Sequence, residues 1–198
     1  MQREDWDRKY AAQVRLWSDR PNRTVVAELS GLAPGRALDL ACGEGRHAVM
    51  LAGLGWDVTG VDFPEIAIAK ARARSVEEEL DIQFVCADLL RYDPEPAAFD
   101  LVLVVYLQIP SAERRLVLAE AASALARGGS LVLLGHDLTN LAEGVGGPSD
   151  PEVLYTPDDI AAELPDLEIE KAERVLRDVA GADRPAIDAL VRARRPKG

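Results

Sequence analysis

Short apolar runs alternate with amphipathic segments along the first two thirds of the chain. The apolar runs are 37–41, 57–61, 82–86, 99–107 and 130–135. A strand between parallel neighbours is covered on both faces, and the almost wholly apolar run at 99–107 has this character. Each of the runs is therefore predicted to be a strand.

Three segments between these runs have features typical of helices. Residues 46–54 are followed by Gly55, and residues 111–127 are followed by a pair of glycines. The third helix begins near Pro64, a residue that suits the first helical turn. Apolar positions at spacings of three and four predict one buried face on this helix, consisting of Ile66, Ala69, Ala73, Val76 and Leu80.

The last third of the chain has a different pattern. Residues 156–159 have the form of a capping box, which predicts a short helix to about Leu164. Two β-like stretches follow, at about 167–179 and 185–195, and the break at 180–183 predicts a hairpin. Apolar and polar positions alternate only imperfectly in the second stretch.

The complete order of predicted elements defines a fold class. Five strands that alternate with helices are followed by an antiparallel pair. This order predicts an α/β protein with a doubly wound, Rossmann-like sheet of seven strands, mostly parallel and with a C-terminal antiparallel hairpin. Ligands of such sheets bind beyond the carboxyl ends of the strands, beside the first strand.

Composition and charge exclude several classes of function. The chain has 34 acidic residues against 23 Lys and Arg, a formal charge of −11, which disfavours nucleic acids and anionic membrane surfaces as partners. No apolar run approaches the roughly 18 residues of a membrane span, and residues 1–10 lack the apolar core of a signal peptide, so a cytoplasmic location is expected. Two cysteines and two histidines are too few for a disulfide framework or a Cys/His zinc site, and no metal is expected.

Small and polar residues follow the ends of the predicted strands. Asp39 lies in the first strand, and the turn after it contains Cys42, Gly43 and Gly45. Glycines at this place let a ligand approach the backbone, because they have no Cβ atom. Asp62 ends the second strand 19 positions after Gly43, close to the spacing of about 20 at which a carboxylate can bind a ribose. The later strand ends contribute Asp88 with Leu89, Tyr106 with Gln108, and His136 with Asp137.

An NAD-type oxidoreductase is one hypothesis for such a chain. Gly43, Gly45 and Ala48 satisfy a loose dinucleotide-binding pattern. An acidic side chain inside the first strand argues against this hypothesis, since Asp39 suits a cationic ligand better than a pyrophosphate. The fifth strand also leads into a long loop and a hairpin, and not into a second mononucleotide-binding half.

Taken together, the motifs resemble those of class I S-adenosylmethionine-dependent methyltransferases. LDLACGEGRHA resembles the first motif of that family, GVDF the second, VCADLL the third, FDLVLVV the fourth, and LARGGSLVLL the glycine turn into strand five. The resemblance extends from residue 36 to about 195. The short chain and its N-terminal tryptophans are most similar to the small tellurite-resistance and thiopurine methyltransferase-like group.

The resemblance implies S-adenosylmethionine as the cofactor and S-adenosylhomocysteine as its product. It places Asp39, Cys42, Gly43 and Gly45 at the methionine end of the cofactor. It implies that Asp62 accepts hydrogen bonds from the ribose hydroxyls, that Asp88 binds the adenine amino group, and that the Leu89 backbone N–H meets a ring nitrogen. Phe63 and Tyr106 complete the expected set of cofactor-binding residues.

The resemblance also implies a methyl transfer to a small-molecule acceptor by in-line attack on the cofactor methyl. His136, after the fifth strand, is the candidate general base, because a histidine titrates near neutral pH; a structural role in holding the next loop is the alternative. In relatives, a histidine often stands where this chain has Gln108. Arg174 and Arg177 either face an anionic acceptor or are surface charges. The expected walls of the acceptor pocket are Tyr10, Trp17, Gln108 and Asp137.

A chain of this length is expected to form one domain with four segments. These are an N-terminal helical cap at 1–30, a cofactor-binding half at 31–136, a lid loop at 137–155, and a C-terminal helix and hairpin at 156–198. The cap is inferred from Trp6, Tyr10, Val14 and Trp17, whose spacing also fits an amphipathic helix that only packs on the domain. The lid is inferred from the length and the Gly/Pro content of its segment. A non-catalytic S-adenosylmethionine-binding module is a further alternative for the whole chain.

Overall fold

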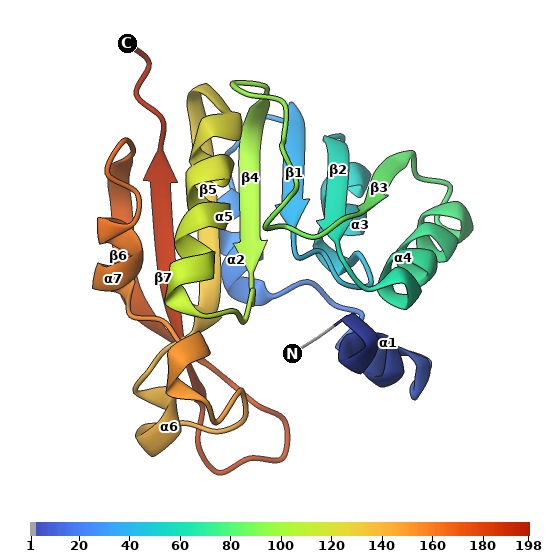
Figure 1. Ribbon diagram of the computed structural model, residues 1–198, viewed down its shortest axis with the longest axis vertical. Helices are drawn as coiled ribbons and strands as arrows, with labels where there is room; N and C mark the ends of the chain where they lie inside the picture. Colours follow the sequence, from blue (N-terminus) through green and yellow to red (C-terminus); the bar gives the residue numbers. More distant parts are fainter. Residues whose placement is uncertain (1–2) are drawn as a thin grey trace.

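Seven strands form one sheet in the order β3-β2-β1-β4-β5-β7-β6 in the computed structural model, which describes residues 3–198 (Figure 1). Strands β1 to β5 pair in parallel, and β7 pairs antiparallel with both β5 and β6. The predicted fold class is therefore confirmed. The strands are β1 (Arg36–Leu40), β2 (Asp57–Asp62), β3 (Ile82–Cys86), β4 (Phe99–Val105), β5 (Leu125–His136), β6 (Glu168–Arg177) and β7 (Ala186–Arg194).

Helices cover both faces of this sheet, and alternate strand residues point to opposite sides. Leu101 belongs to a core cluster with Leu51 and with residues of α2 and α4, whereas Val102 belongs to a second cluster with Leu118 and with residues of α7. The helices are α1 (Arg3–Ala11), α2 (Arg23–Leu29), α3 (Arg46–Gly53), α4 (Glu65–Glu77), α5 (Ser111–Ala124), α6 (Asn140–Glu143) and α7 (Pro157–Ala162), with a 3₁₀ turn η1 at Pro151–Val153.

The position of β7 explains the imperfect alternation in its sequence. It lies between β5 and β6, and its residues belong to both core clusters, Ala189 and Val191 to one and Leu190 to the other, so both of its faces are covered. Six consecutive residues, 186–191, are buried, and Asp188 among them has no exposed surface. A charged residue at such a position needs partners inside the protein.

Helix α4 buries a different face from the predicted one. Its buried residues are Ala67, Ile68, Ala71 and Ser75, while Val76 is 76% exposed. The packing surface is made of small residues because the helix lies close to its neighbours: a Cβ on Gly45 would come within 3.1 Å of the Ala71 Cβ. The need for small side chains at this close contact therefore determines which face of α4 is buried, more than the hydrophobicity of its residues does.

The border between α5 and β5 also differs from the prediction. The helix ends at Ala124, and β5 begins at Leu125, which pairs with Phe99 before the glycine pair is reached. The register shifts between Phe99 and Leu101. A Cβ on Gly129 would lie 2.9 Å from the Phe99 carbonyl oxygen, so the backbones approach too closely there for any other residue.

The two expected accessory segments, the N-terminal cap and the lid loop, both differ in secondary structure from the prediction. The N-terminal helix ends at Ala11, and Val14 is 92% exposed, so the apolar positions from 6 to 17 do not share one helical face. The segment 137–155 contains α6 and η1, and it is closed by a bridge between Asp137 and Tyr155. It is thus not structureless. Among residues 3–198, no helix combines the length and the apolar character that a bilayer crossing requires.

Candidate functional site

The turn between β1 and α3 depends on its glycines. Gly43 and Gly45 have φ values of 56° and 78°, a region in which side chains are disfavoured. A Cβ on Gly45 would lie 3.0 Å from the Phe84 ring, and a Cβ on Gly43 would lie 3.1 Å from the Tyr10 hydroxyl. The turn is therefore packed tightly against β3 below it and against the N-terminal segment.

Asp62 joins this turn to the end of β2. Its carboxylate accepts the Gly43 backbone N–H at 2.7 Å and the Phe63 backbone N–H at 2.8 Å. Burial nevertheless raises the pKa of Asp62 to about 6, since the two hydrogen bonds offset only part of the desolvation. The two strand ends that the sequence analysis linked by their spacing are thus in direct contact.

Asp39 lies beside this pair and is the least satisfied charged group of the site. It is 1% exposed, and neither of its carboxylate oxygens has a hydrogen bond within residues 3–198. Burial raises the pKa of Asp39 to about 7, and the charge of Asp62 adds to the rise. The Arg46 charge and the Ala48 backbone N–H oppose it, although that N–H lies outside hydrogen-bonding geometry.

Arg46 is the first residue of α3, directly after the glycine turn. Burial lowers the pKa of its guanidinium, which lies 5.9 Å from the centre of the Tyr106 ring. No hydrogen bond or ion pair joins it to another described residue. Asp39 thus provides the site with a group that can bind a cation, and Arg46 provides one that can bind an anion.

The N-terminal segment lies against the glycine turn. Glu44, inside the turn, accepts the Leu16 backbone N–H at 3.0 Å and pairs with Lys70 of α4 at 3.1 Å. Lys70 also donates to the Tyr10 and Gln13 carbonyl oxygens, each at 2.6 Å. The ion pair thus fastens residues 10–16 to the binding edge of the sheet.

Aromatic residues of this segment form a small cluster over the turn. Tyr10 is buried, and its hydroxyl accepts the Trp17 indole N–H at 3.2 Å. The Trp6 ring centre is 6.0 Å from that of Tyr10 and 6.5 Å from that of Trp17. Trp17 is half exposed. The structure therefore places both predicted pocket residues of the segment next to the glycine turn.

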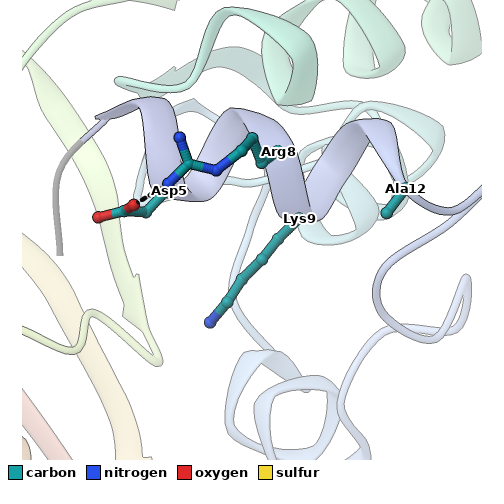
Figure 2. Close-up of a pocket in the computed structure, with 4 residues that line it drawn as sticks. All are labelled: Asp5, Arg8, Lys9 and Ala12. Carbon is teal, nitrogen blue, oxygen red and sulfur yellow. Dashed lines mark hydrogen bonds and ion pairs between the residues drawn. The ribbon is translucent and has the colours of Figure 1, made fainter.

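An open surface depression of about 460 Å³ adjoins α1 (Figure 2). It is lined by Asp5, Arg8, Lys9 and Ala12, and the figure shows the Lys9 side chain extending away from the Asp5–Arg8 ion pair. None of the strand-end residues takes part in it.

Asp88 has a local contact that a turn residue would have. Its carboxylate accepts the Leu90 backbone N–H at 3.0 Å, and its carbonyl oxygen accepts the Arg91 N–H. Leu89 is buried against the core. Cys42 is also buried in a core cluster, and burial raises the pKa of its thiol well above the usual value, which excludes it as a nucleophile.

Tyr106 ends β4 in a left-handed conformation with φ 58°, which turns its side chain into a polar network. Its hydroxyl donates to Asp188 at 2.8 Å and accepts from the Asn22 amide at 3.0 Å. Arg177 of β6 donates to the same carboxylate at 2.7 Å. Burial alone would raise the pKa of Asp188, but contacts with His136, Arg177 and Tyr106 outweigh it and lower the pKa.

His136 belongs to this network. Its ring centre is 4.9 Å from that of Tyr106, and its Nδ1 atom is 3.2 Å from an oxygen of Asp188. Because Tyr106 also lies near Arg46, one aromatic ring separates the candidate base from the glycine turn.

The remaining candidates from the sequence are Asp137, Arg174, Arg177 and Gln108. The Asp137 carboxylate accepts from Thr139 and from Arg174 of β6, so it fastens the loop after β5. Arg174 and Arg177 thus pair with buried acids and are not free surface charges. Gln108 is half-buried between β4 and α5, without a hydrogen bond to another described site residue.

Sequence reasoning missed several residues of the site. His47 is 3% exposed and accepts the Asn22 backbone N–H through Nε2. Burial lowers the pKa of His47 to about 3. Asn22, Arg46 and Asp188 were not identified at all. An aspartate within the apolar run AIDALV was the one available signal for Asp188.

The sheet order, with a glycine turn between two acidic strand ends, defines a Rossmann-like cofactor-binding fold. Residues 37–129 match the sequence profile of the Methyltransferase domain family. The chain is therefore similar to class I S-adenosylmethionine-dependent methyltransferases, the TehB-like group among them.

Named relatives share the central part of the chain. A demethylmenaquinone methyltransferase of Thermus thermophilus is 38% identical over 104 residues, which cover 52% of this chain and 47% of that protein. The probable S-adenosyl-L-methionine-dependent methyltransferase TehB of Haemophilus influenzae is 38% identical over 85 residues, covering 40% of this chain and 30% of that protein. The chain thus spans about half or less of the curated relatives it matches.

Solved structures agree over a longer stretch. A protein studied for the conversion of a disulfide bond into a thioacetal group during echinomycin biosynthesis superimposes with a TM-score of 0.78 at 26% identity, covering 98% of this chain and 92% of that chain. TehB from Haemophilus influenzae superimposes with a TM-score of 0.74 at 19% identity, covering 98% of this chain and 67% of that chain. The fold of the whole chain, including its N-terminal and C-terminal segments, therefore occurs in known proteins.

Proposed function

We propose that this chain binds S-adenosylmethionine and transfers its methyl group to a small-molecule acceptor. The relatives named above act, by their names, on small quinone-type molecules or use this cofactor. The cofactor supplies an already activated methyl group, which the acceptor takes by in-line attack, with S-adenosylhomocysteine as the product. The chain's own residues bind, orient and desolvate the two partners.

The state of Asp39 is the observation that carries this proposal. A buried carboxylate without a hydrogen bond is unfavourable unless a cationic group meets it. S-adenosylmethionine carries a sulfonium and an ammonium, whereas the pyrophosphate of NAD would bring further negative charge to Asp39. Arg46 fits the carboxylate at the methionine end. The charges therefore favour a methyltransferase over an oxidoreductase.

The ribose and adenine are assigned to the next two strand ends. Asp62 is held in place by two backbone N–H groups, which leaves acceptor capacity on both oxygens for a vicinal diol. Asp88 and the Leu89 N–H follow β3, beside Phe63 at the end of β2. Tyr10 and Trp17 wall the same edge from the N-terminal segment, which we assign as a cap.

His136 is the proposed general base for oxygen or nitrogen acceptors. It lies at the carboxyl end of β5, one ring away from Arg46. Segment 137–155, fastened by Asp137 and Tyr155, is proposed as the cover of the acceptor side. The excess of acidic over basic residues favours a small acceptor over nucleic acid, and a cytoplasmic setting fits this substrate class.

Calorimetric titration of S-adenosylmethionine into the Asp62→Ala variant tests the proposal. We expect at least a hundredfold loss of affinity, because the variant removes the ribose acceptor and the partner of the Gly43 N–H. Asp57→Ala, at the exposed opposite end of the same strand, is the matched control and should bind as the wild type does. Equal affinity of the two variants would refute the site, and binding of NAD in place of S-adenosylmethionine would refute the function.

A further inference from the structure

We infer that Asp188 is a positioning residue that fixes the proton of His136 on Nδ1 and so leaves Nε2 as the proton-accepting atom. This inference rests on the proposed function only for the role it gives to Nε2. Asp188 was identified neither by a motif nor by its place at a strand end. Its role follows from four contacts and from its burial.

The carboxylate of Asp188 is held from one side by two donors. The Arg177 Nε–H and the Tyr106 hydroxyl both donate to Oδ2, at 2.7 and 2.8 Å. The Tyr106 hydroxyl is the donor in this contact, because an ionised carboxylate can only accept, and the same hydroxyl oxygen accepts from the Asn22 amide. Oδ1 is left for His136, with only a longer 3.5 Å contact from the Arg177 Nη2.

His136 has one acceptor within reach of its Nδ1. That atom is fully buried and has no aligned hydrogen bond in the described part of the chain, and Asp188 Oδ1 lies 3.2 Å away. An imidazole nitrogen in this place, facing a fully buried carboxylate, must carry its proton, since two facing lone pairs would repel. Nε2 is not among the buried nitrogens, and no described residue hydrogen-bonds to it, so it is free to accept a proton from an acceptor molecule.

The ring is also fixed in orientation. The Tyr106 ring lies 4.9 Å from it, and the backbone of the loop lies directly on it: a Cβ on Gly147 would come within 2.9 Å of the His136 Cγ. Gly147 has φ 78°, which other residues rarely adopt. The charged and titratable groups that contact the ring or its carboxylate partner are Asp188 from β7, Tyr106, which directly follows β4, and Arg177 from β6.

The substitution Asp188→Asn tests whether Asp188 determines the position of the His136 ring proton. Arg177 and Tyr106 are both donors to Oδ2, so they hold the amide oxygen at that position. The amide NH₂ then takes the position of Oδ1 and faces His136 Nδ1. Nδ1 must become an acceptor, and the ring proton moves to Nε2, where it blocks the proposed base.

The measurement is the tautomer of His136 by long-range ¹H–¹⁵N correlation NMR on the free protein, at a pH at which the ring is neutral. The chain has only two histidines, and the His136→Gln variant assigns the signals. We expect the wild-type proton on Nδ1 and the Asp188→Asn proton on Nε2. His47 is an internal control, because its Nε2 accepts the Asn22 N–H and its proton should stay on Nδ1 in both proteins.

Asp137→Asn is the matched substitution. Asp137 is equally buried and pairs with an arginine of β6, but no contact joins its carboxylate to the His136 ring. This variant should leave the His136 tautomer unchanged. A wild-type proton on Nε2, or an unchanged tautomer in Asp188→Asn, would overturn the inference. The wild-type spectrum alone decides the matter if Asp188→Asn fails to fold.

Two further readouts separate this inference from the proposed function. Calorimetry should give the same affinity for S-adenosylmethionine in the wild type and in Asp188→Asn, within about twofold. Formation of S-adenosylhomocysteine with a panel of oxygen and nitrogen acceptors should fall by roughly 10²-fold or more in both Asp188→Asn and His136→Ala. Undiminished turnover in both variants would remove His136 as a base, whereas absent cofactor binding in the wild type would refute the proposed function and leave the tautomer result standing.

Discussion

Asp39 lowers the stability of the ligand-free protein and is suited to bind a cationic ligand. Its carboxylate is fully buried at the end of β1, without a hydrogen bond in the described chain. The pKa of about 7 means that the folded protein holds a proton there which the unfolded chain, with an ordinary pKa near 3.8, releases. Stability from this group is therefore complete below about pH 3.8 and is lost progressively as the pH rises from there to about 7.

The substitution Asp39→Asn should accordingly stabilise the free protein at pH 8. An amide keeps the shape and cannot ionise, so we expect a Tm higher by several degrees at pH 8 and a clearly smaller rise at pH 5, where less of the stability has been lost. Thermal unfolding followed by circular dichroism at the two pH values measures this difference. Asp57→Asn, on an exposed strand start, should change the Tm little at either pH. A Tm that falls equally at both pH values would show that Asp39 is satisfied in the fold.

Residues of the cofactor side could be predicted from local sequence, while those of the acceptor side could not. Gly43, Gly45 and Asp62 are recognisable because turn chemistry and the βαβ spacing are local properties. Asp188 gains its role from Tyr106, which directly follows β4, and from His136 of β5 and Arg177 of β6. A sequence pattern that specifies a strand does not specify its neighbour in the sheet.

The N-terminus of helix α4 also depends on a residue that is distant in the sequence. Its start was predicted from Pro64, but Pro64 provides no side-chain cap. The cap comes from the N-terminal segment: Asp7 accepts the Ile66 backbone N–H at 3.0 Å. A carboxylate at a helix N-terminus satisfies a free N–H and the helix dipole, so α1 stabilises α4 from a distance of 59 positions along the chain.

Removal of this cap should therefore weaken the contact between the two helices. Asp7→Ala is expected to cost about 1 kcal/mol of the free energy of unfolding, a Tm decrease of about 2–4 °C. Asp19→Ala, which removes an exposed ion pair with Arg15 at 3.8 Å, is the control and should have almost no effect. Equal melting of the two variants would mean that α1 does not cap α4. Differential scanning calorimetry resolves a change of this size.

For the whole molecule, the topology brings all the proposed functional groups to one edge of the sheet. In Figure 1 the carboxyl ends of β1, β2 and β4 point toward the same side, where α1 and α6 lie at opposite ends of the edge. The alternation of strands and helices was enough to predict this edge, since parallel strands with helical connections allow few arrangements. The insertion of β7 between β5 and β6 could not be read from the pattern, and it is this insertion that delivers Asp188 to the site.

The central claim is that Asp39 and Asp62 together receive one cationic cofactor. Asp39 must lose its proton to meet a cation, so binding of S-adenosylmethionine should release protons and should weaken on acidification below pH 7, by up to about tenfold per pH unit. Calorimetric titration between pH 5.5 and 7.5, in two buffers of different ionisation enthalpy, measures both quantities in one series. The account predicts proton release that is greatest at the acidic end and is strongly reduced in Asp39→Asn. Binding without proton release and with constant affinity over this range, or no binding at all, would contradict it.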